Sequence, residues 1–228
     1  MAITSSRTRS RPALGASGQR ARLCAGLSVP VVAVVDPRAA MGPLAAAVYG
    51  NPAERVTMFG ITGTNGKTST LALLEAALAA IGERVGTIGT IGFRLAGAEL
   101  AMARTTVTTP ESPDLQALLA VMVERGATAI AMEVSSHALA LERVDGIGFD
   151  VAAFTNLGRD HLDFHPDLDD YFRAKSRLFL DGRSRTCVIN IDDEAGRRLE
   201  ALVRADGRAR VLTCAVDRPA DYRVLDAT

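Results

Sequence analysis

The sequence predicts an α/β protein with a doubly wound, mostly parallel sheet and a phosphate-binding loop. Short apolar runs typical of buried strands alternate with helix-length segments from residue 29 onward. One of these runs leads directly into a glycine-rich loop and then a helix. Polar residues also gather just after two other runs, where an open α/β sheet binds its ligands.

The expected elements follow one another without a fixed-period repeat, which excludes a solenoid. Strands are expected over 29–36, 55–63, 84–93, 128–134, 149–156, 186–191 and 209–215. Helices are expected over 37–50, 68–82, 112–126, 167–180 and near 193–205. Gly50 and Gly82 act as helix stop signals, and Ser112 is expected to cap its helix. The chain then ends inside the α/β progression, so we expect the fold to be incomplete at the C-terminus.

The composition bears on which partners and which cellular compartment to expect. Among 228 residues, 26 basic side chains balance 26 acidic ones, which gives no reason to expect a nucleic-acid or membrane partner. No apolar run is long enough to span a bilayer. The three cysteines are odd in number and never spaced as C-x-x-C, which favours a reducing, cytoplasmic compartment. Residues 1–25 carry five arginines and no acid, and we expect a disordered tail there.

The strongest motif is the phosphate loop over residues 60–68, GITGTNGKT, at a strand-to-helix junction. Its glycines let backbone N–H groups converge on phosphate oxygens at a helix N-terminus. Lys67 would bridge the terminal phosphates, and the Thr68 hydroxyl would reach Mg²⁺. Ile61 departs from the strict G-x-x-x-x-G-K-[ST] form. The loop nevertheless predicts a nucleoside triphosphate ligand.

Two strand ends deliver further polar groups to the same edge of the sheet. One end carries Glu133, Ser135, Ser136 and His137; the other carries Asn156, Asp160, His161 and Asp163. All three histidines of the chain, which include His165, fall in this stretch. A structural role is the simpler reading for any single histidine. Their position near the phosphate loop makes His161 the best candidate for a functional one.

Lys175 stands out because Lys67 is the only other lysine, whereas 24 basic residues are arginine. It falls on the apolar stripe of the helix expected over 167–180. A buried amine loses its proton readily and can react with CO₂ to give a carbamate, a carboxylate-like Mg²⁺ ligand. The alternative is a lysine that snorkels at the rim of the helix face. The pattern alone does not choose between the two.

Four segments together resemble the central domain of the Mur ligases, ATP-dependent enzymes of peptidoglycan synthesis. They are TGTNGKTST, TTVTTPESPDLQ, MEVSSHALALERVDGIGFDVAAFTNLGRDHLDFH and YFRAKSRLF. The resemblance covers about residues 29–228 and implies that ATP phosphorylates the carboxylate of a UDP-MurNAc-dipeptide. The amine of a third amino acid, diaminopimelate or lysine, then attacks this acyl phosphate.

The resemblance also implies roles for individual residues. ATP would be held by Gly63, Thr64, Asn65, Gly66, Lys67, Thr68 and Ser69. Magnesium would be held by Thr68, Glu133, His161 and carbamylated Lys175, which with Lys67 make up the catalytic set. The UDP-MurNAc-dipeptide would be held by Thr108, Thr109, Ser135 and Arg143.

Family members have three domains, so the resemblance implies an organisation for this chain. Residues 26–50 would be a remnant of the uridine-binding domain, residues 51–228 the central domain, and the C-terminal domain would be absent. Two alternatives remain: a related ligase of the folylpolyglutamate type, or a fragment that binds nucleotide without turnover. The T-T-P-E-S segment, residues 108–112, argues against the folylpolyglutamate type.

Overall fold

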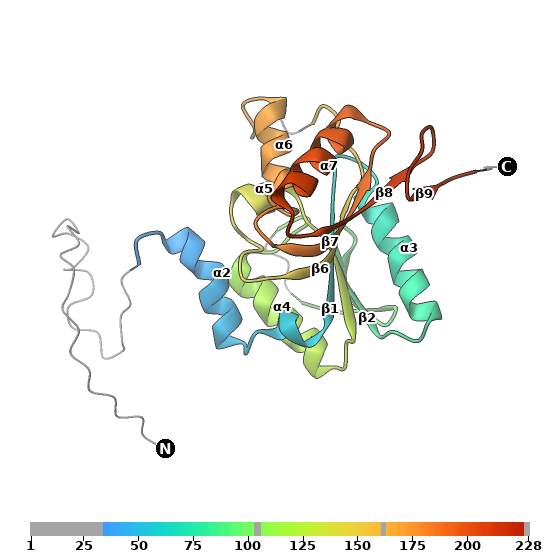
Figure 1. Ribbon diagram of the computed structural model, residues 1–228. Coiled ribbons are helices and arrows are strands. Elements are labelled where there is room, and N and C mark those ends of the chain that lie inside the picture. The colour runs from blue at the N-terminus through green and yellow to red at the C-terminus, as the bar shows by residue number, and fades with distance from the viewer. Residues whose placement is uncertain (1–33, 103–105, 161–162, 226–228) are drawn as a thin grey trace, which may run out of the picture. The chain divides into compact units, whose positions relative to one another are not determined.

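The computed structural model of the chain describes residues 34–102, 106–160 and 163–225 (Figure 1). The helices are α2 Pro37–Val48, α3 Lys67–Ala80, α4 Ser112–Glu124, α5 Ser136–Ala140, α6 Leu168–Ser176 and α7 Glu194–Asp206, with a 3₁₀ turn η1 at Pro52–Arg55. The strands are β1 Thr57–Thr62, β2 Val85–Gly89, β3 Gly92–Leu95, β4 Ala98–Glu99, β5 Ala129–Glu133, β6 Phe149–Phe154, β7 Ser184–Asn190, β8 Arg210–Ala215 and β9 Tyr222–Arg223.

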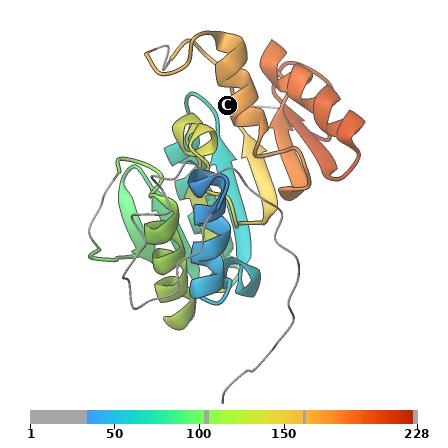
Figure 2. The same cartoon turned by 90° about the vertical axis from the view of Figure 1, so that its left-hand side faces the viewer.

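All of these strands form one sheet in the order β4-β3-β2-β5-β1-β6-β7-β8-β9. Neighbours from β2 to β9 pair in parallel, and only β2–β3 and β3–β4 are antiparallel. The predicted doubly wound, mostly parallel sheet is therefore confirmed. In Figures 1 and 2, α2 and α4 lie on one side of the sheet, and α3 lies on the other side.

The two faces of the sheet are buried very differently. The main core fills the α4 face, where Leu115, Leu119 and Met122 meet the strands, and it continues to Phe172 of α6 and Leu199 of α7. The α3 face holds only a small cluster of Ile61, Leu71 and Ala131. Buried and half-buried residues alternate along β6 and β7. Parallel strands are usually covered on both faces, so this alternation marks a side of β6–β8 that lies open beyond α3.

The sequence-based boundaries need four corrections. The strand predicted over 84–93 is a hairpin of β2 and β3, because Gly92 turns the chain at a φ of +121° that favours glycine. The helix predicted over 167–180 ends at Ser176, whose Oγ donates to the carbonyl oxygen of Phe172. Ser112 does not cap α4, because Glu111 is the N-cap and Ser112 Oγ donates to Glu142 O. Residues 34–36 form no strand, and 29–33 lie outside the described residues.

Contacts divide the chain after Val35, and α2 belongs to the same unit as the sheet through its packing against α4. The expected tail over 1–25 lies outside the described residues. The boundaries at residues 25 and 50 stay predictions. Among the described residues, no helix has the length and apolar character needed to cross a bilayer.

The sheet order places the functional segments side by side. Strand β1 lies between β5 and β6, with Ile61 level with Glu133 and Thr62 level with Phe154. The loop after β1 therefore sits between the chain that follows β5 and the chain that follows β6.

Candidate functional site

The phosphate loop is held in shape by the segment that follows β6. Gly63 has a φ of +152°, and a Cβ there would lie 1.8 Å from Thr155 Oγ1. The Asn65 amide donates to Asn156 Oδ1 at 2.9 Å, and Thr155 Oγ1 donates to the Asn65 carbonyl at 2.7 Å. Gly66 then caps α3 in the left-handed region. The loop is thus built in advance at a helix N-terminus, as anion binding requires.

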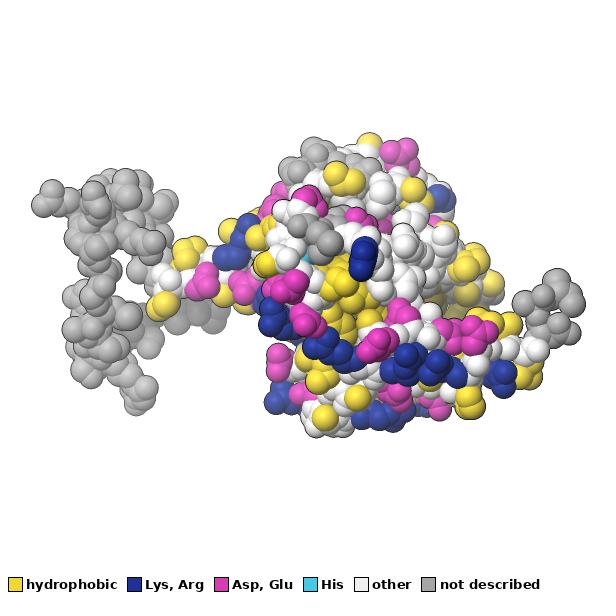
Figure 3. All heavy atoms as spheres, turned by 90° about the horizontal axis from the view of Figure 1, so that it is seen from above, with side chains coloured by type: hydrophobic (Ala, Val, Ile, Leu, Met, Phe, Trp, Pro, Cys, Tyr) yellow, Lys and Arg dark blue, Asp and Glu magenta, His cyan; other side chains and the backbone are white. Residues whose placement is uncertain are grey.

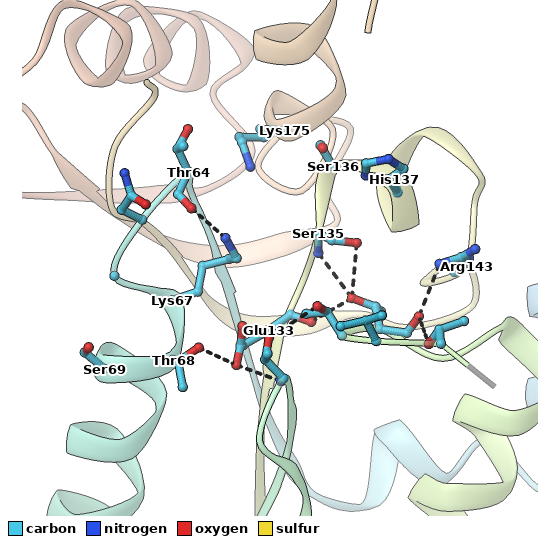
Figure 4. Close-up of a pocket in the computed structure, with 17 residues that line it drawn as sticks. Thr64, Lys67, Thr68, Ser69, Glu133, Ser135, Ser136, His137, Arg143 and Lys175 are labelled. Atoms are coloured by element: carbon cyan, nitrogen blue, oxygen red, sulfur yellow. Dashed lines mark hydrogen bonds between the residues drawn. The ribbon is translucent and has the colours of Figure 1, made fainter. Parts of the chain in front are cut away.

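Both lysines of the chain converge on this loop. Lys67 Nζ donates to the carbonyl oxygens of Gly63 and Thr64 at 2.8 and 2.9 Å. Lys175 Nζ, although it comes from α6, also donates to Gly63 O at 2.8 Å. Figure 4 shows both ammonium groups on the same side of Thr64.

The shared position affects the protonation of both amines. Burial, and next the charge of Lys67, lower the pKa of Lys175 from 10.5 to about 7, while Asp160 acts in the opposite direction. Burial also lowers the pKa of Lys67, partly offset by Glu133 and Asp160. Lys175 can therefore exist as a neutral amine near neutral pH.

The snorkelling interpretation of Lys175 is wrong, because its side chain is only 1 % exposed. Its ammonium lies 4.5 Å from the centre of the Tyr171 ring. The Tyr171 hydroxyl in turn lies 3.2 Å from Thr64 Oγ1, within hydrogen-bond distance. Tyr171 was not singled out from the sequence, because in an apolar stripe an aromatic residue is indistinguishable from core.

Glu133 is fully buried at the end of β5, and two threonines donate hydrogen bonds to its carboxylate. Its Oε1 accepts from Thr68 Oγ1 and from the Thr90 amide, each at 3.0 Å, and its Oε2 accepts from Thr90 Oγ1 at 3.1 Å. Gly89 leaves the room for this carboxylate, since a Cβ there would lie 2.4 Å from Oε1. Thr90 was missed because the hairpin that presents it was predicted as one strand.

The donor set fits magnesium in part. Thr68 Oγ1 and Glu133 Oε1 are adjacent hard oxygens, and Mg²⁺ commonly takes one or two protein oxygens together with phosphate oxygens and water. Among the described residues, no group of three His, Cys, Asp or Glu side chains could enclose a metal alone. Lys175 Nζ donates to Gly63 O, and in its protonated form it has no lone pair with which to bind a metal. His161 lies outside the described residues.

A second set of polar groups lies on the far side of Glu133. Thr109 Oγ1 donates to Glu133 O at 3.0 Å and accepts from the Ser135 amide at 3.2 Å. Arg143 Nη1 donates to Thr109 O at 3.4 Å, and Thr108 Oγ1 lies 3.2 Å from Thr90 Oγ1. Each residue predicted to hold the dipeptide therefore lies in one cluster (Figure 4).

One cavity of about 750 Å³ connects the loop to this cluster. Among the described residues predicted from the resemblance, all but Gly63 line it: Thr64, Asn65, Gly66, Lys67, Thr68, Ser69, Thr108, Thr109, Glu133, Ser135, Arg143 and Lys175. On the face seen in Figure 3, Lys and Arg lie beside Asp and Glu without a patch of one sign. The positive charge of the cavity therefore comes from its own lining residues Lys67, Arg143 and Lys175.

The two described histidines have different places. His137 lines the cavity, and its ring lies 4.1 Å from the ring of Phe164. His165 is 1 % exposed, and its Nδ1 lies 2.8 Å from Asp170 Oδ2. His165 is therefore a structural histidine that fixes the start of α6.

A second, more apolar cavity of about 580 Å³ was not predicted from the sequence. It begins at Gly66 and Thr70, beside the loop, and extends over the open side of β6–β8 toward Asn190, Cys214 and Tyr222. Its residues come from strands far along the chain and share no motif.

Comparison with known proteins agrees with this geometry. The family model of the Mur ligase middle domain matches residues 61–227. The chain belongs to the Mur ligase family. The predicted family is thereby confirmed, and the match ends within a few residues of β9.

Two relatives of this family bear the same name. The UDP-N-acetylmuramoyl-L-alanyl-D-glutamate–2,6-diaminopimelate ligase of Streptomyces avermitilis is 50 % identical over 203 residues, 89 % of this chain. A solved structure of a ligase with this name is 28 % identical, with a TM-score of 0.73 over 85 % of this chain. The chain spans 39 % of the first relative's length and 40 % of the second's.

The same fold occurs in Mycobacterium tuberculosis folylpolyglutamate synthase complexed with ADP and AMPPCP, at 17 % identity and a TM-score of 0.65. That comparison covers 80 % of this chain and 49 % of the synthase. It shows a shared fold.

Proposed function

We propose that this chain forms the ATP-binding part of a ligase that adds the third amino acid to UDP-MurNAc-L-Ala-D-Glu in peptidoglycan synthesis. The observation that carries the proposal is the single cavity that joins the phosphate loop, through Glu133, to Thr109 and Arg143. A carboxylate bound near Arg143 would face a triphosphate held by Lys67. The name shared by the two ligase relatives supports diaminopimelate as the acceptor amino acid.

The chemistry would be positioning and charge neutralisation. Loop amides at the start of α3 hold phosphate oxygens, and Lys67, now bonded to two carbonyls, turns to the transferred phosphoryl group. Arg143 and Thr109 hold the acceptor carboxylate so that its oxygen faces the terminal phosphorus. No general base is needed to phosphorylate an ionised carboxylate.

Thr68 and Glu133 would hold Mg²⁺, with His161 as a further predicted ligand. The ion would neutralise charge on the phosphate oxygens. The hydrogen bond between Thr68 and Glu133 keeps both oxygens together in its absence. The Thr68 O–H therefore points at the Glu133 carboxylate.

Lys175 would act as a carbamate. Its neutral amine attacks CO₂, a C–N bond forms, and one proton leaves to solvent. Burial beside Lys67 supports this, because an anion there would form an ion pair with Lys67 in place of the present repulsion between two cations. The carbamate oxygens would also be suitable Mg²⁺ ligands.

The apolar cavity beyond Gly66 would hold the nucleoside end of ATP. It adjoins the loop on the side away from Glu133, so a bound triphosphate could extend from one cavity into the other. Free Cys187 and Cys214 agree with a reducing, cytoplasmic compartment.

The test is calorimetry with ATP·Mg²⁺ and with UDP-MurNAc-L-Ala-D-Glu on the chain. Binding of both ligands supports the proposal, and a folded chain that binds neither contradicts it. A folylpolyglutamate-type ligase is the second candidate, favoured by the shared fold. Binding of a folate in place of the UDP-sugar peptide would support that candidate.

A further inference from the structure

Glu111 lies between two arginines that come from distant parts of the chain. Its Oε2 lies 2.7 Å from Nη1 of Arg38, and its Oε1 lies 2.7 Å from Nη2 of Arg143. Arg38 is on the first turn of α2, before the phosphate loop, whereas Arg143 lies in the turn after α5. We propose that Arg38 is a positioning residue, which acts through Glu111 to hold the Arg143 guanidinium at the substrate end of the cavity.

Arg143 needs such support because few groups hold it. Its side chain is 16 % exposed, and its one hydrogen bond to a backbone carbonyl within the described part of the chain, that of Thr109, is long at 3.4 Å. Arg143 Nε is buried and has no hydrogen-bond partner among the described residues. The Glu111 carboxylate therefore fixes both the charge and the orientation of this side chain.

Arg38 also changes the charge that an incoming ligand meets. Glu111 and Arg143 alone form a neutral pair, which attracts an anion weakly. With Arg38 on the other carboxylate oxygen, the three side chains carry one net positive charge, and Arg143 is the member that lines the cavity. The Coulomb attraction between Arg143 and a substrate carboxylate is then less cancelled by Glu111.

The backbone provides a second, independent link between α2 and Arg143. A Cβ on Gly42 of α2 would lie 2.0 Å from the carbonyl oxygen of Asp145, so the helix packs directly on the turn that carries Arg143. Gly146 in this turn has a φ of +84°, and a Cβ there would lie 2.8 Å from the carbonyl oxygen of Gly42. Asp145 is itself held by both Nη atoms of Arg183, at 2.6 and 3.1 Å. A shift of α2 would therefore move Arg143 through main-chain and side-chain contacts together.

The first measurement needs no ligand. In the full chain, NMR of the Arg143 Nε–H group reports how freely the guanidinium rotates. We expect Arg38→Gln to increase this rotation several-fold and Arg38→Lys to restore part of the restraint. Arg94→Gln is the matched control, because the Arg94 side chain is as exposed as that of Arg38 (38 % against 39 %). Arg94 lies on β3 and pairs with Glu75 of α3, away from Glu111. An unchanged Arg143 signal in Arg38→Gln would overturn the inference.

The second measurement rests on the proposed function and uses UDP-MurNAc-L-Ala-D-Glu as the probe. Arg38→Gln should weaken its binding about threefold, as expected for a partly exposed ion pair, and leave ATP affinity unchanged. Its effect should vanish in the Glu111→Gln background, since the link is then already broken. If Arg143 loosens but the parent chain binds no UDP-sugar peptide, the positioning role stands and the proposed substrate is wrong. If the substrate binds equally to parent and Arg38→Gln, the positioning role is wrong.

Discussion

Lys67 and Lys175 donate hydrogen bonds to the same carbonyl oxygen, that of Gly63, each at 2.8 Å. Two ammonium groups at one acceptor repel each other, which is one cause of the lowered pKa of Lys175. The arrangement is thus sensitive to any anion that enters the loop, because an anion relieves this repulsion.

Replacing Lys67 should therefore have two effects. Lys67→Ala should weaken ATP·Mg²⁺ binding at least about tenfold, because a charge-assisted contact to phosphate is lost. It should also raise the pKa of Lys175, since the neighbouring positive charge disappears. Calorimetry measures the first effect and NMR titration of the Lys175 side chain measures the second. A folded variant with unchanged ATP affinity would contradict the assignment of the loop.

Lys175 should make the fold less stable at neutral pH than at alkaline pH. Its pKa is about 7 in the folded chain and near the ordinary 10.5 when unfolded, so between these values the unfolded state binds more protons. The free energy of unfolding should then rise as pH increases from about 7 toward 10. Below that range Lys175 is charged in both states, so its destabilising effect is fully present and no longer varies with pH. Urea unfolding across this range measures the slope, and Lys175→Met should remove the contribution of Lys175.

That experiment also bears on the carbamate. In the presence of ¹³CO₂, a carbamate resonance should appear in the parent chain and be absent in Lys175→Met. If the labelled parent chain shows no such resonance with nucleotide and Mg²⁺ present, Lys175 acts as an amine only.

Gly89 offers a test of the proposed magnesium site that replaces no polar residue. Gly89→Ala would place a Cβ 2.4 Å from Glu133 Oε1 and push the carboxylate away from Thr68. We expect nucleotide affinity to lose most of its Mg²⁺ dependence. Gly148→Ala is the control, because a Cβ there meets nothing within 4 Å. Equal Mg²⁺ dependence in both variants would count against Glu133 as a ligand.

Thr109 links the two ends of the cavity through Glu133 O and the Ser135 amide. Thr109→Val keeps the shape but removes the hydroxyl, and leaves the partly buried Ser135 amide without this acceptor. It should destabilise the chain by about 1–3 kcal/mol and weaken binding of the UDP-sugar peptide, with ATP binding retained. Thermal unfolding and calorimetry measure the two effects. Ser136→Ala is the matched control, because Ser136, at the start of α5, has a buried hydroxyl without a hydrogen-bond partner among the described residues.

Features that depend on a local residue pattern could be predicted from the sequence. The alternation of strands and helices predicted the parallel sheet, and the glycines before Lys67 predicted the loop. Lys175 could be singled out because a charged residue interrupted an apolar stripe.

Features that depend on a turn or on distant pairing were not predictable in this way. The hairpin at Gly92 has the same apolar pattern as a continuous strand, so Thr90 was assigned to a strand interior. The ion pairs of Glu111 join segments 73 and 32 residues away, and no local pattern records such a distance. The cavity beyond Gly66 arises only when the four strands β6, β7, β8 and β9 are side by side.

The turn between β2 and β3 has a dynamic consequence. Thr90 gives Glu133 two of its three hydrogen bonds, yet it sits at the tip of a short antiparallel hairpin near the edge of the sheet, beside Ile91, which is 61 % exposed. Such hairpins open locally far more often than a central strand does. Each opening releases the buried carboxylate from its cage, so amide hydrogen exchange in β3 and the loss of bound Mg²⁺ should follow the same opening equilibrium.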